Sequence, residues 1–233
     1  MSWNQPSSIA VDARDARVTG FLSKVYGWMF LGLLITAGTA FVVASSPLLI
    51  ETFILNRVLF WILVLGQLGL VFYLSIRVEK ISPVTAAALF MVYSATVGIT
   101  TSVILLIYTA TSIFSTFVVT AGMFGALALF GTFTRKSLAG VGQFMFMGLI
   151  GLIIASVVGL FWQNSALQFV ISVVGVIVFT GLTAWDAQRL KQMAVALPDG
   201  RVGAYAVVGA LSLYLDFINL FFFLLRFMGG RRD

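Results

Sequence analysis

The residues Ser212-Leu-Tyr-Leu-Asp216-Phe-Ile-Asn219-Leu-Phe-Phe-Phe-Leu-Leu225 have the composition of a membrane-spanning helix, but with a carboxylate at its centre. A central Asp costs about 2.5–3.5 kcal/mol on insertion scales, so its presence requires a reason. Steps of three and four place the small and polar side chains on one helix face: Gly209, Ser212, Asp216, Asn219 and Phe223. That face is expected to contact protein and not lipid. We predict that this segment is the central helix of a bundle, with Asp216 at the functional site.

The composition is that of an integral membrane protein. Of the 233 residues, 61% are hydrophobic and 9% are charged, whereas a soluble domain carries about 25% charged residues. The chain has no Cys and no His, which removes disulfides, thiol redox chemistry, the usual zinc sites and Ser–His catalysis. The net charge of +6 lies mostly in short loops, where it indicates topology signalling and not nucleic-acid binding. No cofactor is expected.

Seven apolar runs are each long enough to cross about 30 Å of hydrocarbon. They predict an all-α, polytopic membrane protein, with a flexible cytoplasmic tail at residues 1–20 and one seven-helix transmembrane domain over residues 21–233. The expected spans are Phe21–Ala44, Val58–Ile76, Pro83–Tyr108, Ser112–Phe133, Ala139–Trp162, Ala166–Asp186 and Val207–Phe227. Residues 109–111 and 163–165 are expected to form tight hairpins. An odd number of spans places the two termini on opposite sides of the bilayer.

Basic residues in the loops predict the orientation. Ten of the 14 Lys and Arg residues lie in or beside the N-terminal tail and the second, fourth and sixth connections. The other four are Arg57 and a C-terminal group, Arg226, Arg231 and Arg232. This C-terminal group is the one feature that disagrees with the orientation predicted by the rest. Because positive residues mark the cytoplasm, we expect a cytoplasmic N-terminus and a periplasmic or extracellular C-terminus.

Polar and small residues inside the other spans have structural explanations. Gln67, in the second span, is expected to form a hydrogen bond between helices. The glycines at 122, 125, 142, 148 and 151 are expected to let helices approach closely.

Two of the eight acidic residues, Asp186 and Asp216, remain as candidates for buried chemistry. Asp186 is also compatible with a solvated position at the cytoplasmic end of the sixth span. However, no helix breaker follows it until Pro198. If the helix continues to Met193, Asp186 lies about 10 Å below its end, and Asp216 lies about 13 Å down the next span. Because these helices are antiparallel neighbours, the two carboxylates can meet.

Two carboxylates in a poorly solvated site cannot both ionise cheaply, so the pair is expected to share a proton and to respond to pH. When both are ionised, Asp186 and Asp216 suit a hard cation such as Ca²⁺. Ser212 and Asn219, on the same face, are candidates to support the pair. Arg77 and Lys80, at the cytoplasmic end of the second span, are candidate counter-charges, and an Arg closing onto one carboxylate would act as a latch.

The last-span stretch, together with Trp185-Asp-Ala-Gln-Arg-Leu-Lys191, resembles the Bax inhibitor-1 (transmembrane Bax-inhibitor-motif) family, most closely its bacterial inner-membrane branch. The resemblance covers all seven spans. It implies a last helix wrapped by the other six, and a pH-dependent Ca²⁺ leak controlled by an aspartate pair that maps to Asp186 and Asp216. It also implies a latch arginine at the end of the second helix, for which Arg77 is the nearest match.

The function expected from these features is a pH-sensitive Ca²⁺ or cation leak channel, not an enzyme, in which Ca²⁺ is the transported ion. The alternative is a membrane-embedded regulator that binds a membrane protease or another stress-response protein, with the polar N-terminal tail as the contact. Paired aspartates also occur in intramembrane aspartyl proteases. Their Gly-x-Gly-Asp and Pro-Ala-Leu motifs are absent here, and no pair of Pro/Gly-broken helices indicates an inverted-repeat transporter.

Overall fold

The computed structural model describes residues 8–162 and 164–232, which form helices and short connections. Seven helical spans are long and apolar enough to cross a membrane, which confirms the predicted all-α membrane fold. The elements are α1 (Ser8–Ala44), α2 (Pro47–Ile50), the π-helical turn η1 (Glu51–Leu55), α3 (Arg57–Arg77), α4 (Pro83–Thr101), α5 (Val103–Ile107), α6 (Ala110–Phe133), α7 (Ala139–Phe161), α8 (Ser165–Ala196), the 3₁₀ turn η2 (Asp199–Arg201) and α9 (Val202–Met228).

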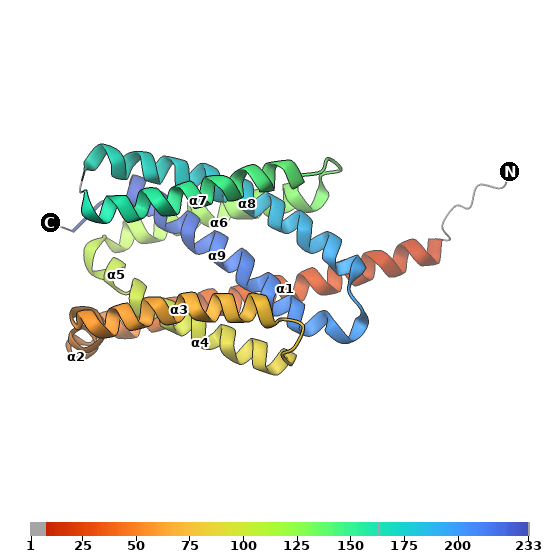
Figure 1. Ribbon diagram of the computed structural model, residues 1–233, viewed down its shortest axis with the longest axis horizontal. Coiled ribbons are helices and arrows are strands. Elements are labelled where there is room, and N and C mark those ends of the chain that lie inside the picture. The colour runs from red at the N-terminus through yellow and green to blue at the C-terminus, as the bar shows by residue number, and fades with distance from the viewer. Residues whose placement is uncertain (1–7, 163, 233) are drawn as a thin grey trace.

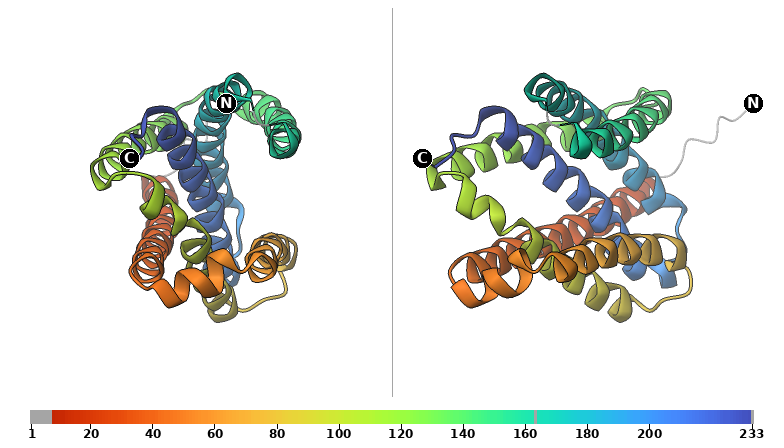
Figure 2. Two further views of the ribbon diagram at one scale, coloured as in Figure 1. Left: turned by 90° about the vertical axis from the view of Figure 1, so that its left-hand side faces the viewer. Right: turned by 60° about the vertical axis from the view of Figure 1, so that its left-hand side comes forward.

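Helix α9 runs obliquely through the middle of the bundle, between α1, α3 and α4 on one side and α6, α7 and α8 on the other (Figure 1). It packs against α1, α4, α6 and α8 and touches α3. Of its most hydrophobic stretch, 56% is buried, compared with 11% for α7 and 6% for α3. The last helix is therefore the central one, as predicted, while α7 packs mainly on α8 at the outside of the bundle (Figure 2).

Side-chain caps begin the helices where the sequence changes from loop to span. Thr109 accepts a hydrogen bond from the Ser112 amide at the start of α6, and Asn164 accepts from Ala166 and Leu167 at the start of α8. Each cap satisfies amides that have no partner inside the helix. The predicted hairpin at residues 109–111 is formed between α5 and α6, whereas residue 163 of the second lies outside the described residues. The start of α1 and the end of α9 lie at opposite ends of the molecule (Figure 1).

The N-terminal segment differs from its prediction. Helix α1 begins at Ser8, so residues 8–20 are helical, and residues 1–7 lie outside the described part of the chain. The segment contains Ala10, Ala13 and Ala16 and no Pro or Gly before Gly20, and such a composition favours helix. Arg17 donates a hydrogen bond to the Leu197 carbonyl just beyond α8, which ties this segment to the bundle.

The third span is interrupted at Ser102, between α4 and α5. Thr100 and Thr101 donate to backbone carbonyls three and four residues before them, and Ser102 donates to the Ile99 carbonyl. Hydroxyls that compete for backbone carbonyls bend helices. The single span expected over Pro83–Tyr108 is therefore two helices that cross the hydrophobic layer together.

Close helix contacts form at some of the predicted glycines and not at others. A Cβ at Gly142 would overlap the Trp185 ring, so α7 and α8 approach closely there. Gly122, Gly125 and Gly151 have open space where a Cβ would lie, so the prediction was wrong for these three. Gln67 donates to Thr100 Oγ1 at 3.1 Å and links α3 to α4, as expected.

Candidate functional site

Helices α8 and α9 bring the candidate residues together because both extend beyond the predicted spans. Helix α8 continues to Ala196, so Asp186 lies about 15 Å from its end. Helix α9 begins at Val202, which places Ser212 about 15 Å and Asp216 about 21 Å along it. Ser212 is therefore level with Asp186, and Asp216 lies one turn deeper. Asp186 and Asp216 are each 5% exposed, so the carboxylate pair is buried.

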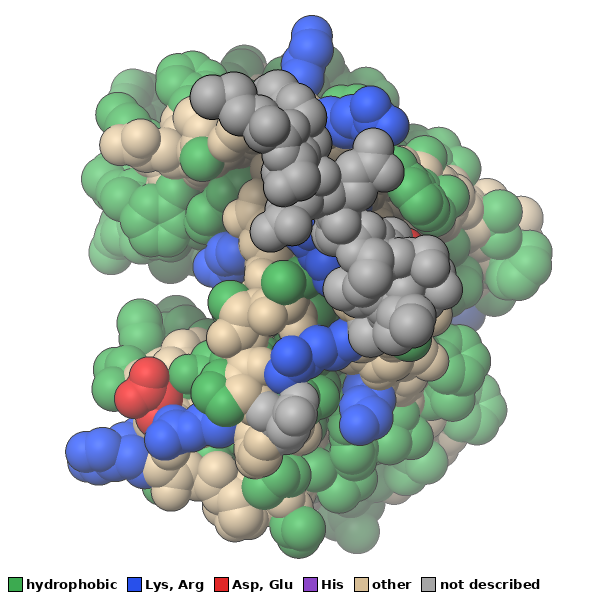
Figure 3. Space-filling model, turned by 90° about the vertical axis from the view of Figure 1, so that its right-hand side faces the viewer, with side chains coloured by type: hydrophobic (Ala, Val, Ile, Leu, Met, Phe, Trp, Pro, Cys, Tyr) green, Lys and Arg blue, Asp and Glu red, His purple; other side chains and the backbone are tan. Residues whose placement is uncertain are grey.

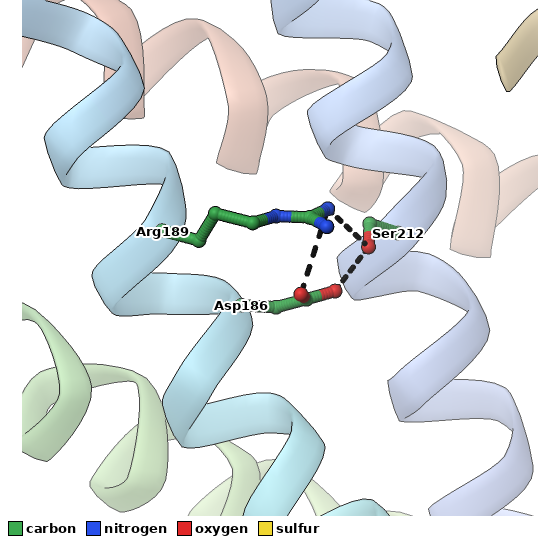
Figure 4. Close-up of polar contacts among 3 residues, drawn as sticks. All are labelled: Asp186, Arg189 and Ser212. Carbon is green, nitrogen blue, oxygen red and sulfur yellow. Dashed lines mark hydrogen bonds and ion pairs between the residues drawn. The ribbon is translucent and has the colours of Figure 1, made fainter. Parts of the chain in front are cut away.

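Asp186 is held by a network that joins α8 to α9 (Figure 4). The Ser212 hydroxyl donates to Asp186 Oδ2. The Arg189 guanidinium lies 3.5 Å from Asp186 Oδ1 and also donates to Ser212 Oγ at 3.4 Å. Arg189 stacks over Trp185, with its guanidinium carbon 5.0 Å from the ring centroid. One arginine thus contacts the carboxylate on its own helix and the hydroxyl on the neighbouring helix.

Asp216 is also buried, but its carboxylate has fewer polar contacts than that of Asp186. It lies within electrostatic range of Asp186, a like charge, and of Arg189, an opposite charge. Among the described residues, its Oδ2 atom has no hydrogen-bond partner, and the same is true of Asp186 Oδ1 and Arg189 Nε. Buried polar atoms in folded proteins are nearly always hydrogen-bonded. Three unpartnered atoms in one cluster therefore distinguish this site from the rest of the core.

The polar stripe of α9 faces α8, as its spacing predicted. Ser212 contacts Asp186, Gly209 lies against Leu190, and Phe223 lies against Gly175. Asn219 donates to the Leu215 carbonyl of its own helix at 2.8 Å. Ser212 therefore supports the pair directly, whereas the Asn219 amide hydrogen bond stays within α9.

The arginine beside the carboxylates is Arg189 and not either latch candidate. Arg77 and Lys80 are exposed, and within the described residues neither forms an ion pair with Asp186 or Asp216. The end of α3 borders the same cavity as Arg189, through Ser75 and Val78, but the Arg77 side chain is exposed and α3 is the least buried span. The signal for Arg189 was present in the sequence, because residues three apart on a helix are neighbours.

A cavity of about 370 Å³ leads from the loop end of the molecule to this network. Its lining includes Arg189 and Ser212 at the inner part, together with Leu215, and Tyr205 nearer the loops. At the loop end, Glu79 links α9 to the α3–α4 connection: its carboxylate accepts from the Tyr205 hydroxyl at 3.3 Å, and its carbonyl accepts from Arg201 at 3.1 Å. Arg189 and Ser212, which both contact Asp186, therefore border a cavity near the loop end of the bundle.

Beyond the carboxylates, toward the C-terminal end of α9, the packing is apolar. The buried hydrophobic residues there belong to α7, α8 and α9: Leu152, Ile171, Val178, Phe179, Leu182, Leu220 and Leu224. Phe179 and Phe223 stack with ring centroids 5.9 Å apart. We call this group the apolar plug.

The described residues contain no group of three or more acidic, His or Cys side chains that could hold a metal ion. Ca²⁺ in proteins takes six to eight oxygen ligands. Two carboxylates and a hydroxyl supply part of such a shell, with waters needed for the rest.

Comparison with known proteins gives one consistent result. The family model described as inhibitor of apoptosis-promoting Bax1 matches residues 18–233. The inner membrane protein YbhL of Escherichia coli K12 is 46% identical over 230 residues, which covers 97% of this chain and 98% of the relative. An uncharacterised protein of Borreliella burgdorferi is 46% identical over 215 residues, covering 91% and 93%, and YrjE of Lactococcus lactis is 38% identical over 232 residues, covering 97% and 99%.

Proposed function

The chain belongs to the Bax inhibitor family, and on this premise we propose that it is a pH-sensitive leak pathway for cations, with Ca²⁺ as the transported ion. The observation that carries the proposal is the buried pair Asp186 and Asp216, each with an oxygen that accepts no hydrogen bond, next to Arg189 and Ser212, which line a cavity. A buried ionisable group in a membrane helix is costly, and such groups mark ion or proton pathways.

The proposed gate is the network around Asp186. With its carboxylate ionised, Asp186 attracts Arg189 and accepts from Ser212, so α8 and α9 are held together. A proton on Asp186 removes the charge that Arg189 pairs with and weakens the link to Ser212, because hydrogen bonds to charged groups are roughly twice as strong as neutral ones. The helices are then free to separate. The leak should therefore increase as pH falls.

The apolar plug supports the interpretation that the structure described above is a state closed to ions. An apolar constriction excludes ions by excluding water. For an ion to pass from the carboxylates to the far end, α8 must move relative to α9 around Phe179 and Leu220, where the two helices now pack through hydrophobic side chains. Separation of α8 from α9 would wet this region and complete the path.

We further propose that the protein lies in a bacterial cytoplasmic membrane with its N-terminus in the cytoplasm. The relative YbhL is named as an inner membrane protein. Ten of the 14 basic residues belong to the end of the bundle where α1 begins, which fits the positive-inside rule. In this orientation the cavity beside Arg189 opens toward the cytoplasm.

The test is Ca²⁺ flux in proteoliposomes across an acidic-to-alkaline pH series, for the parent and for Asp186→Asn. Asparagine imitates the protonated, uncharged side chain, so the variant should leak at every pH, at about the rate that the parent reaches when acidic. Glu51→Gln removes an exposed carboxylate at the other end of the bundle and serves as the matched control. If Asp186→Asn keeps the parental pH profile, the proposed gate is wrong.

A further inference from the structure

A second polar cavity lies at the same end of the bundle, separate from the carboxylate pair. It measures about 630 Å³ and is bounded by the start of α1, the α6–α7 connection and the end of α8. Its charged lining is formed by Arg14, Arg135, Lys136 and Lys191, with Asp15 as the one acidic residue among them. Lys and Arg side chains gather around the hollowed face that Figure 3 views. Four cations and one carboxylate give the lining of this cavity an excess of positive charge.

The basic groups are available to a ligand. Within the described residues, the side chains of Arg14, Arg135 and Lys136 form no ion pair and no hydrogen bond, and Arg135 and Lys136 are exposed. Lys191 donates to the Thr132 carbonyl at 2.7 Å and retains further donors, since an ammonium group has three.

The loop that carries two of these cations is fixed in place by a buried side chain. Gln188 is 7% exposed; its amide nitrogen donates to the Lys136 carbonyl at 2.9 Å, and its amide oxygen accepts from the Leu138 backbone at 2.8 Å. The bond from Lys191 to Thr132 fastens the other side of the connection. Binding an anion here therefore does not require the loop to be ordered first, which lowers the entropic cost.

The cavity lies where the lipid-facing surface ends. Phe130 and Phe133, on the last turns of α6, are 56% and 73% exposed, and Val141, on the first turn of α7, is 42% exposed. The polar loop and its cations begin directly beyond them. This is the level of lipid headgroups, where basic pockets between helices on the cytoplasmic side recognise anionic lipids.

We propose that this cavity binds the phosphate headgroup of an anionic phospholipid from the surrounding leaflet, with Arg135 and Lys136 as its main contacts. Soluble phosphate compounds offer the same charge. The lipid is favoured because the exposed side chains of Phe130 and Phe133 provide the surface along which its acyl chains would lie.

The experiment titrates phosphatidylglycerol into the purified full-length protein in detergent, and bound lipid is counted by native mass spectrometry. Phosphatidylcholine, inorganic phosphate and the double variant Arg135→Gln/Lys136→Gln are run in parallel. We expect the parent to bind phosphatidylglycerol in preference to phosphatidylcholine, and the double variant to bind it about 30-fold more weakly, because two basic residues near an anionic surface are lost. The control variant, Arg231→Gln/Arg232→Gln, removes two exposed cations at the opposite end and should bind as the parent does.

Equal binding by parent and double variant, or equal affinity for the two lipids, would overturn the proposal. Inorganic phosphate that displaces the bound lipid at comparable concentration would assign the site to a soluble anion and overturn the lipid source. If the double variant does not fold, Arg14→Gln, a single exposed substitution, should still weaken binding of phosphatidylglycerol by several-fold.

Discussion

Helix α9 carries two polar clusters on opposite faces, and they differ in how well their atoms are partnered. On the face toward α1 and α4, Tyr214 is completely buried and its hydroxyl lies 2.6 Å from Thr36 Oγ1. Thr36 Oγ1 lies 2.9 Å from both the Gly32 and the Ser94 carbonyl oxygens, either of which accepts its single proton, and Ser94 donates to the Phe90 carbonyl. The rings of Phe90 and Tyr93 pack edge-on against Tyr214. This neutral cluster is complete.

On the face toward α8, the cluster of Asp186, Arg189, Ser212 and Asp216 is charged and incomplete, with three atoms lacking a partner in the described structure. A satisfied neutral network specifies one arrangement of helices. The contacts of a charged cluster change with its protonation state. On the proposed function we therefore expect α1, α4 and α9 to stay together, and the contact between α8 and α9 to be the one that moves.

The largest effect is expected from Tyr214→Ala, which removes the centre of the fixed cluster. It should lower the stability of the protein by about 3–5 kcal/mol, because it leaves a cavity beside Phe90 and Tyr93 that the surrounding rings cannot fill. Thermal unfolding in detergent measures the loss. Tyr73→Ala removes an aromatic ring that is 48% exposed on α3 and should cost far less; equal losses would show that Tyr214 is not a core residue.

Asp216→Asn should act in the opposite direction on stability. In mildly alkaline solution it removes a buried charge with an unpartnered oxygen, and it should raise stability by about 1–3 kcal/mol, the cost of an unsatisfied buried group. The same variant should flatten the dependence of Ca²⁺ flux on pH, because one of the two titrating groups is gone. A variant that is less stable than the parent, with an unchanged flux profile, would show that the charged cluster is structural like its neutral counterpart.

Two substitutions with smaller effects on stability distinguish the role of the charged cluster from that of the neutral cluster. Ser212→Ala and Tyr214→Phe each remove one hydroxyl that links α9 to another helix, and each should cost about 0.6 kcal/mol, the average for hydrogen bonds between membrane helices. Only Ser212→Ala should raise Ca²⁺ flux at neutral pH, since only that bond joins α9 to the proposed gate. Flux that rises equally in both variants would mean that loosening any contact of α9 opens the path.

The spans, the central helix and the buried pair could be predicted from the sequence, because hydropathy follows from local composition and the rise per residue of an α-helix is constant. The predicted first, sixth and seventh spans were shorter than α1, α8 and α9. These helices continue beyond the hydrophobic layer, where hydropathy does not distinguish helix from loop. Ser212 was identified from its position on the stripe. Asn219 shares the stripe but forms its hydrogen bond to its own backbone, a choice of rotamer that spacing does not determine.

The latch could not be predicted because it depends on how helices pack. Arg77 and Lys80 were chosen for their depth along the second span, but the distance between α3 and α9 is a tertiary property. Arg189 was counted among the loop cations because it follows the last apolar residue of its span. Its inward direction comes from Trp185, whose ring it covers, and from the close approach of α7 at Gly142.

The smallest effect is expected at the residue that the family resemblance favoured. Arg77→Gln should leave both stability and the pH profile of Ca²⁺ flux within error of the parent, because Arg77 is exposed and has no partner among the described residues. Arg189→Gln keeps a hydrogen-bond donor beside Ser212 but removes the charge facing Asp186, so it should change the pH profile. If Arg77→Gln changes the profile and Arg189→Gln does not, α3 must close onto the carboxylates in a second conformation, and the movable contact would then lie between α3 and α9.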